Sequence, residues 1–236
     1  MKTGKGPWSL YLLYGLVIGT LLTGILWGSK AVTVLSEKVS IDREYRIIID
    51  PGHGGEDGGA TSCTGKLESE YNLVISKRLD DLFHLLGYET CMIRTTDTSV
   101  YTKGDTIAQK KVSDLKERVR IVNETENGIL LSIHQNNFPD NRYSGAQVFY
   151  ADSEGSQILA QKIQDTFVQS LNQGSNRKCK PSKGVYLMEH IQHTGVLIEC
   201  GFLSNPEEAA KLRDPDYQKK VCCVIAAAVS QYLSNT

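Results

Sequence analysis

The chain has 236 residues, 40% of them hydrophobic and 22% charged, a composition typical of a folded α/β domain and unlike that of a disordered or fibrous chain. Residues 31–236 contain 23 basic and 27 acidic side chains, because three of the 26 basic residues and none of the acidic ones lie in residues 1–30. A domain with this slight negative charge lacks the basic surface that nucleic-acid binding requires, so we expect no nucleic-acid partner.

The first thirty residues form a separate segment. The stretch 6–29 contains no charged residue, and its apolar run has the roughly 20 residues that a helix needs to cross a bilayer. Lys2 and Lys5 precede this run, so the positive-inside rule leaves the N-terminus in the cytoplasm and the rest of the chain outside. A cleaved signal peptide is the alternative, but the run is longer than a usual signal core. The sequence therefore predicts three parts: a membrane anchor or uncleaved signal at 1–30, a linker at 31–44 and a folded domain at 45–236.

Strand and helix patterns alternate from residue 46 onward. The apolar positions of Arg46–Ile49 predict a buried strand, and five glycines between residues 52 and 59 then release the backbone from ordinary limits. Leucines at helical spacing predict a helix from Glu68 to a stop at Gly87, followed by a strand at 88–94. A strand, helix and strand of these lengths are typical of a parallel pair.

The second half of the domain continues the alternation. We expect a long polar loop at 95–111, a helix from Ser113 to Thr125, strands at 128–133, 145–150, 185–188 and 196–198, and a helix at 156–171. Asn205 before Pro206, and Asp214 before Pro215, have the N-cap and first-turn residues that begin helices, the last of which runs to Leu233. The whole pattern predicts an α/β fold.

The six cysteines are scattered and contain no Cys-x-x-Cys spacing. Thiolate zinc ligation requires closely spaced cysteine pairs, so the pattern argues against it. We expect buried free thiols instead.

Polar residues with metal-ligand chemistry stand where strands end and a helix begins. His53 and His134 each follow an apolar strand, Glu68 starts a helix, and Glu199 ends the last strand. Two histidines and a carboxylate with an open fourth position are the ligand set of a hydrolytic zinc site, and a carboxylate in an apolar setting suits a general base. Each residue alone also has a structural interpretation, and Glu70 competes with Glu68 for the ligand role.

Four segments together resemble the zinc-dependent N-acetylmuramoyl-L-alanine amidases of the amidase-3 type. They are Asp50-Pro-Gly-His-Gly-Gly, Glu68 with Asn72-Leu73, Ser132-Ile-His-Gln-Asn, and Val196-Leu-Ile-Glu-Cys-Gly-Phe-Leu-Ser-Asn. The resemblance implies a twisted, mostly parallel six-stranded sheet flanked by helices, with Zn²⁺ held by His53, Glu68 and His134 and with Glu199 as the catalytic residue. Its spacing selects Glu68 over Glu70, whereas Gln135 departs from the small residue usual after the second histidine.

The resemblance also implies a function. The family hydrolyses the amide between the lactyl group of N-acetylmuramic acid and L-alanine of peptidoglycan, and the short domain with one N-terminal segment is most similar to the sporulation and germination branch. That branch acts in spore cortex maturation toward muramic-δ-lactam. We expect peptidoglycan as substrate, contact with the membrane through residues 1–30, and an activator protein as a further partner.

Two other functions compete with this one. Another metal-dependent peptidoglycan peptidase would use the same ligands, and a non-catalytic wall-binding or partner-docking module would keep the fold without the chemistry. As substrate contacts beyond the metal site, the polar loops suggest Asn136, Arg118 and Lys183.

Overall fold

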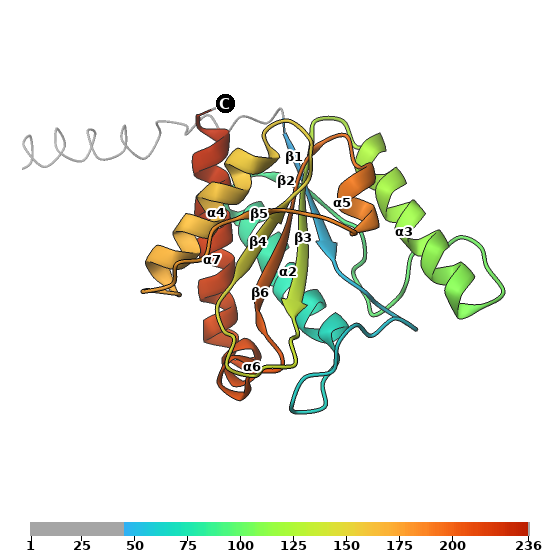
Figure 1. Ribbon diagram of the computed structural model, residues 1–236. Helices are drawn as coiled ribbons and strands as arrows, with labels where there is room; N and C mark the ends of the chain where they lie inside the picture. The colour runs from blue at the N-terminus through green and yellow to red at the C-terminus, as the bar shows by residue number, and fades with distance from the viewer. Residues whose placement is uncertain (1–44, 236) are drawn as a thin grey trace, which may run out of the picture. The chain divides into compact units, whose positions relative to one another are not determined.

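The computed structural model describes residues 45–235, and these fold into a sheet with helices on both faces (Figure 1). The predicted anchor and linker, residues 1–44, lie outside the described residues. Within 45–235, no helix is long and apolar enough to cross a membrane. In chain order the elements are β1 (Arg46–Pro51), α2 (Glu68–Leu85), β2 (Glu89–Met92), α3 (Ile107–Glu124), β3 (Gly128–Asn136), β4 (Gln147–Tyr150), α4 (Ser156–Ser170), β5 (Lys180–Pro181), α5 (Tyr186–His190), β6 (Thr194–Phe202), α6 (Pro206–Arg213) and α7 (Pro215–Leu233).

The sheet has six strands in the order β2-β1-β3-β6-β4-β5. All neighbouring pairs are parallel except β4 and β6, which run antiparallel. The predicted α/β architecture with a mostly parallel six-stranded sheet is therefore confirmed. Because β1, β3 and β6 are adjacent and parallel, their carboxyl ends meet at one edge of the sheet.

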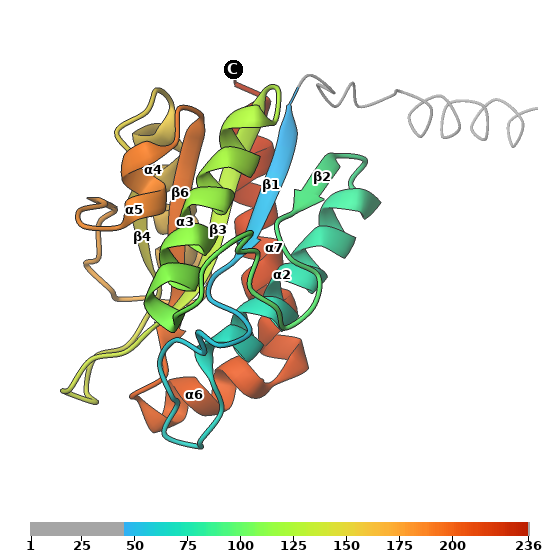
Figure 2. The same cartoon turned by 90° about the vertical axis from the view of Figure 1, so that its right-hand side faces the viewer.

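Alternating side chains on the central strands divide the core between two faces. Ile47, Ile49 and Ile198 pack in the cluster that also contains residues of α2, α4 and α7, whereas Ile48 and Leu197 pack with residues of α3 and α5. Figure 2 shows α3 and α5 in front of the sheet and α7 behind it. A strand buried on both faces is apolar at every position, which explains the uninterrupted runs of isoleucine and leucine in the sequence.

Two helix starts agree with their predicted caps. The side chain of Asn205 accepts hydrogen bonds from the backbone N–H groups of Glu207 and Glu208, and that of Asp214 accepts one from Asp216. Each cap satisfies donors that the first turn of a helix leaves free, and the following proline supplies a suitable φ angle.

Helix α3 begins earlier than predicted. It starts at Ile107, where Thr106 accepts from Gln109 N–H and Gln109 Oε1 accepts from Thr106 N–H, a capping box with little apolar periodicity behind it. Ser113, which we expected to be the cap, lies inside the helix, and its hydroxyl accepts hydrogen bonds from the N–H groups of Thr102 and Lys103.

The strand predicted at 185–188 is also wrong. These residues enter the short helix α5, whose Leu187 and Met188 pack against Ile48 and Leu197 on one face of the sheet. The sixth strand is instead β5, two residues that pair with the end of β4. A short apolar run fits either a strand or a buried helix, and here the run forms a helix that covers one face of the sheet.

The six cysteines are all unpaired, as predicted, but only Cys200 and Cys222 are buried. Burial raises the pKa of both thiols. Both therefore behave as small apolar core residues.

Candidate metal centre and active site

A cleft of about 370 Å³ opens at the carboxyl ends of β1, β3 and β6, and residues of α3 and α5 also line it. Three of the four predicted site residues line it: His53, His134 and Glu199. The fourth, Glu68, is 4% exposed and lies against both histidines. The structure therefore brings all four predicted residues to one place, as expected for strand ends that share an edge.

The two histidines and Glu68 form a compact group. Glu68 Oε1 lies 2.9 Å from His134 Nδ1, and Glu68 Oε2 lies 3.3 Å from His53 Nε2. One ligand atom from each residue lies within 4.8 Å of the other two. Glu70, the alternative ligand, instead pairs with Lys66 and with the N–H of Leu67 at the surface.

Glu68 is held as a carboxylate. Burial alone would raise its pKa, but hydrogen bonds with His134 and His53 outweigh that effect and lower the pKa well below the usual range. The backbone N–H groups of Ala60 and Gln135 also donate to its two oxygens. An ionised, oriented carboxylate is the form that a metal ion requires.

Glycines make room for this group. A Cβ on Gly52 would lie 2.2 Å from His134 Nε2, and one on Gly59 would lie 2.7 Å from Glu68 Oε2. His53 itself has a φ of 59°, in the left-handed region that non-glycine residues seldom adopt. The loop after β1 thus follows a path that few sequences allow, and this path turns the His53 side chain toward Glu68.

Glu199 lies opposite His134 in the β3–β6 register and differs from Glu68 in its surroundings. Its Oε2 is buried and has no hydrogen-bond partner among the described residues. Burial raises the pKa of this carboxyl to about 7, and the nearby Glu68 charge adds to the effect while His134 opposes it. A carboxylate with this pKa can both accept and release a proton near neutral pH.

The donor set and its surroundings fit a zinc ion. Two imidazole nitrogens and one carboxylate are the ligands of catalytic zinc sites that leave a position open for substrate or water. Gly52 and Gly59 leave the space that the ligands occupy, and the unpartnered Oε2 of Glu199 borders the same cleft. Only His53, Glu68 and His134 form such a group among the residues that the structure describes.

Arg118, predicted as a substrate contact, also has a structural role. It is 3% exposed, and its guanidinium donates hydrogen bonds to Asp50, Asp114 and the carbonyls of Pro51 and His53. It therefore supports the loop after β1, and because Arg118 also lines the cleft, its role as a substrate contact stays a prediction. The other two predicted contacts, Asn136 and Lys183, are half-buried and exposed respectively and stay predictions.

Sequence reasoning missed the residues that support the loop. Arg94 donates to the carbonyls of Pro51, Gly52 and Ser69, and Asn72 donates to Gly52 as well. The carboxylate of Asp57 contacts His53 from the side opposite Glu68. Its position four residues after His53 was visible in the sequence, but a flexible glycine loop gives no periodicity from which to infer the contact.

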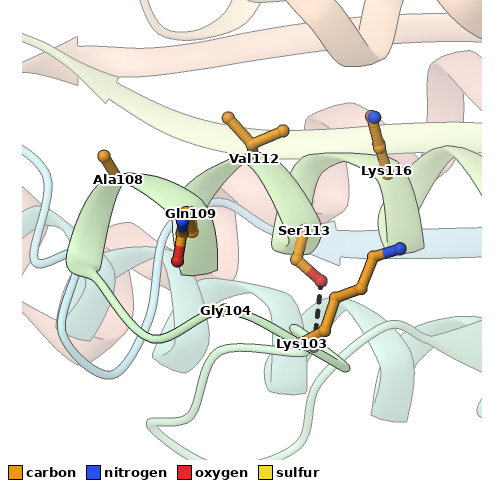
Figure 3. Close-up of a pocket in the computed structure, with 7 residues that line it drawn as sticks. All are labelled: Lys103, Gly104, Ala108, Gln109, Val112, Ser113 and Lys116. Carbon is orange, nitrogen blue, oxygen red and sulfur yellow. Dashed lines mark hydrogen bonds between the residues drawn. The ribbon is translucent and has the colours of Figure 1, made fainter.

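A second hollow, of about 480 Å³, lies between α3 and the loop before it (Figure 3). Figure 3 shows Ala108, Val112 and Lys116 on one side of the helix and Ser113 turned toward the backbone of Lys103. The α3 residues that line this hollow differ from those that line the cleft. Its lining contains no histidine or carboxylate, so it has no metal-ligand set.

Histidine and carboxylate ligands at the carboxyl edge of a parallel sheet, with a further free carboxylate, are typical of a metal-dependent hydrolase. Residues 47–231 match the sequence profile described as N-acetylmuramoyl-L-alanine amidase, amidase-3. The chain belongs to this family.

Individual relatives agree with the family assignment. The chain is 39% identical over 192 residues to the germination-specific N-acetylmuramoyl-L-alanine amidase of Bacillus subtilis, covering 80% of each chain. The structure is similar to that of the CwlD amidase of Clostridioides difficile in complex with the GerS lipoprotein, with a TM-score of 0.78, 36% identity, and coverage of 81% of this chain and 100% of that one. An N-acetylmuramoyl-L-alanine amidase of Clostridium difficile 630 follows, with a TM-score of 0.72, 29% identity and coverage of 83% and 100%.

Proposed function

We propose that the protein hydrolyses the amide bond between the lactyl group of N-acetylmuramic acid and L-alanine of peptidoglycan, with Zn²⁺ held by His53, Glu68 and His134. The observation that carries the proposal is the buried, unpartnered Oε2 of Glu199 beside this histidine–carboxylate group. A structural carboxylate in that position would be expected to have hydrogen-bond donors around it. The family match supports the choice of bond.

Glu199 and Glu68 have different roles in the proposed reaction. Zinc, when bound, supplies a Lewis acid that eases deprotonation of water and polarises the scissile carbonyl. Glu199 accepts the proton from the attacking water as the new C–O bond forms, and it delivers a proton to the nitrogen as the C–N bond breaks. Its pKa of about 7 suits both transfers. Glu68 stays ionised throughout because two histidines and two backbone N–H groups stabilise its charge.

The relatives also support a proposal for the biological setting. Similarity to a germination-specific amidase favours a role in spore cortex, where removal of stem peptides prepares muramic acid for conversion to muramic-δ-lactam. The similar structure with a lipoprotein bound favours an activator protein as partner. In this proposal residues 1–30 anchor the enzyme, and residues 45–236 act outside the cytoplasmic membrane.

The test is product analysis of purified peptidoglycan treated with the full chain and with Glu199→Gln. The parent should contain one equivalent of zinc and release peptides with a free L-alanine amine, whereas the variant should keep its zinc and lose about 10²- to 10⁴-fold in rate. Release of C-terminal amino acids from the stem peptide would instead indicate a metal-dependent peptidase. Binding to the wall without cleavage, with or without a partner protein, would indicate a non-catalytic module.

A further inference from the structure

Asp57 lies between the metal-binding group and helix α3. Its Oδ2 is 3.1 Å from His53 Nδ1 and 3.0 Å from Lys111 Nζ, while its Oδ1 accepts a hydrogen bond from Gly59 N–H. The loop that carries Asp57 runs beside the first turns of α3 (Figure 2). One carboxylate oxygen is thus shared by a candidate zinc ligand and a lysine from another element.

The contact with Asp57 determines which nitrogen of His53 is left to bind a metal ion. An ionised carboxylate only accepts hydrogen bonds, so the imidazole nitrogen that faces Asp57, Nδ1, carries the proton. The other nitrogen, Nε2, faces Glu68 Oε2 3.3 Å away, and it is the nitrogen whose lone pair a metal ion between the two residues would bind. A neutral imidazole binds a metal through such a lone pair, and the hydrogen bond at its second nitrogen fixes the tautomer and the ring orientation.

Helix α3 in turn fixes the carboxylate. Lys111 holds the oxygen that faces His53, and Arg118, two turns further along α3, donates to the carbonyl of His53 itself. The backbone and the side chain of His53 are therefore both attached to the same helix. His53 needs this support because its loop is rich in glycine and its own φ angle is positive.

We propose that Asp57 is a positioning residue for His53, holding the imidazole in the tautomer and orientation that bind zinc, with Lys111 fixing the carboxylate. This inference rests on the proposed function, because it takes His53 as a zinc ligand. Its readout is metal affinity, which is independent of whether the loaded protein cleaves peptidoglycan.

An alternative is that Asp57 and Lys111 only attach the loop to the helix. The neighbouring pair provides a matched control: Lys110 Nζ lies 2.8 Å from Glu56 Oε1 and joins the same loop to the same helix, without a contact to His53 among the described residues. If attachment alone mattered, loss of Glu56 and loss of Asp57 would have equal effects.

The experiment measures the zinc dissociation constant of the full chain by competition with a chromophoric chelator. The variants are Asp57→Ala, Asp57→Asn and Glu56→Gln, with thermal melting of each to check the fold. Loss of a carboxylate that supports a zinc-bound histidine weakens binding about 10- to 100-fold, and this is the expectation for Asp57→Ala. Asp57→Asn should lose less, because its amide oxygen still accepts from Nδ1, and Glu56→Gln should bind like the parent.

The outcomes separate this inference from the proposed function. Zinc affinity of Asp57→Ala within twofold of the parent, or an equal loss in Glu56→Gln, would overturn the positioning role while leaving the zinc site intact. A parent chain that binds no zinc would overturn the metal site of the proposed function, and the positioning role with it.

Discussion

Replacing Arg118 with methionine should destabilise the fold strongly. Its guanidinium is 3% exposed, donates to the carboxylates of Asp50 and Asp114 and to two loop carbonyls, and has its own pKa raised by Asp50 despite the opposing effect of burial. Methionine fills a similar volume without the charge. The variant leaves Asp50, which is 1% exposed, as a buried carboxylate with Ser132 as its remaining side-chain donor.

The size of the effect follows from that uncompensated charge. Removing one partner of a buried ion pair costs about 3–5 kcal/mol of unfolding free energy. For a domain of this size, about 2–4 °C per kcal/mol converts this to a fall in Tm of about 6–20 °C. Arg120, which pairs with Glu117 and Glu124 on the exposed side of α3, is the control: Arg120→Met should leave Tm nearly unchanged because water screens its charges.

The assay is urea unfolding, monitored by circular dichroism. It compares the parent with Arg118→Met, Asp50→Asn and the double variant. A double-mutant cycle isolates the coupling of the pair, since removing both charges together should destabilise less than the two single losses combined. Equal stability of Arg118→Met and Arg120→Met, or no coupling in the cycle, would refute the reasoning that Arg118 supports the loop through Asp50.

Two further predictions concern the same loop. Gly52→Ala places a Cβ 2.2 Å from His134 Nε2, so the ring must move; amidase assays should show a loss of about 10²-fold, and parent-like activity would contradict the packing described. The pH dependence of stability should report Asp50: burial would raise its pKa, but Arg118 and Ser132 lower it below the ordinary value of 3.8. Because the folded-state pKa is the lower one, the stabilisation is fully present above about pH 4 and is lost as pH falls through the folded value. Urea titrations should therefore show a constant difference between parent and Asp50→Asn from neutral pH to about pH 4 that shrinks below it; a constant difference at all pH values would count against this pKa.

The four site residues could be predicted because the sheet imposes their meeting point. Three parallel strands, β1, β3 and β6, are neighbours, so residues at their carboxyl ends are brought together whatever the loops between them do. His53, His134 and Glu199 are such residues, and Glu68 starts the helix that follows the first loop. In the sequence, the point where an apolar run changes abruptly to polar residues indicates where a strand ends and therefore which residues lie at this edge.

Other features could not be predicted because they depend on tertiary contacts. Arg118 has no local sign of burial in a helix rich in charged residues, and only the buried Asp50, 68 positions earlier, explains its place. Likewise β5 is two residues long and exists as a strand through its pairing with β4. The early start of α3 is different, because its capping box between Thr106 and Gln109 is a local pattern, but little apolar periodicity follows it to indicate a helix.

The left-handed backbone of His53 places the requirements of folding and of the proposed metal site in conflict at a single position. A non-glycine residue with φ near 59° costs about 1–3 kcal/mol, a penalty that glycine would relieve. The substitution that most eases the chain at this turn is thus one that deletes a proposed zinc ligand. Selection for robustness alone would drive this turn toward glycine, so a histidine there can persist only while its imidazole is needed.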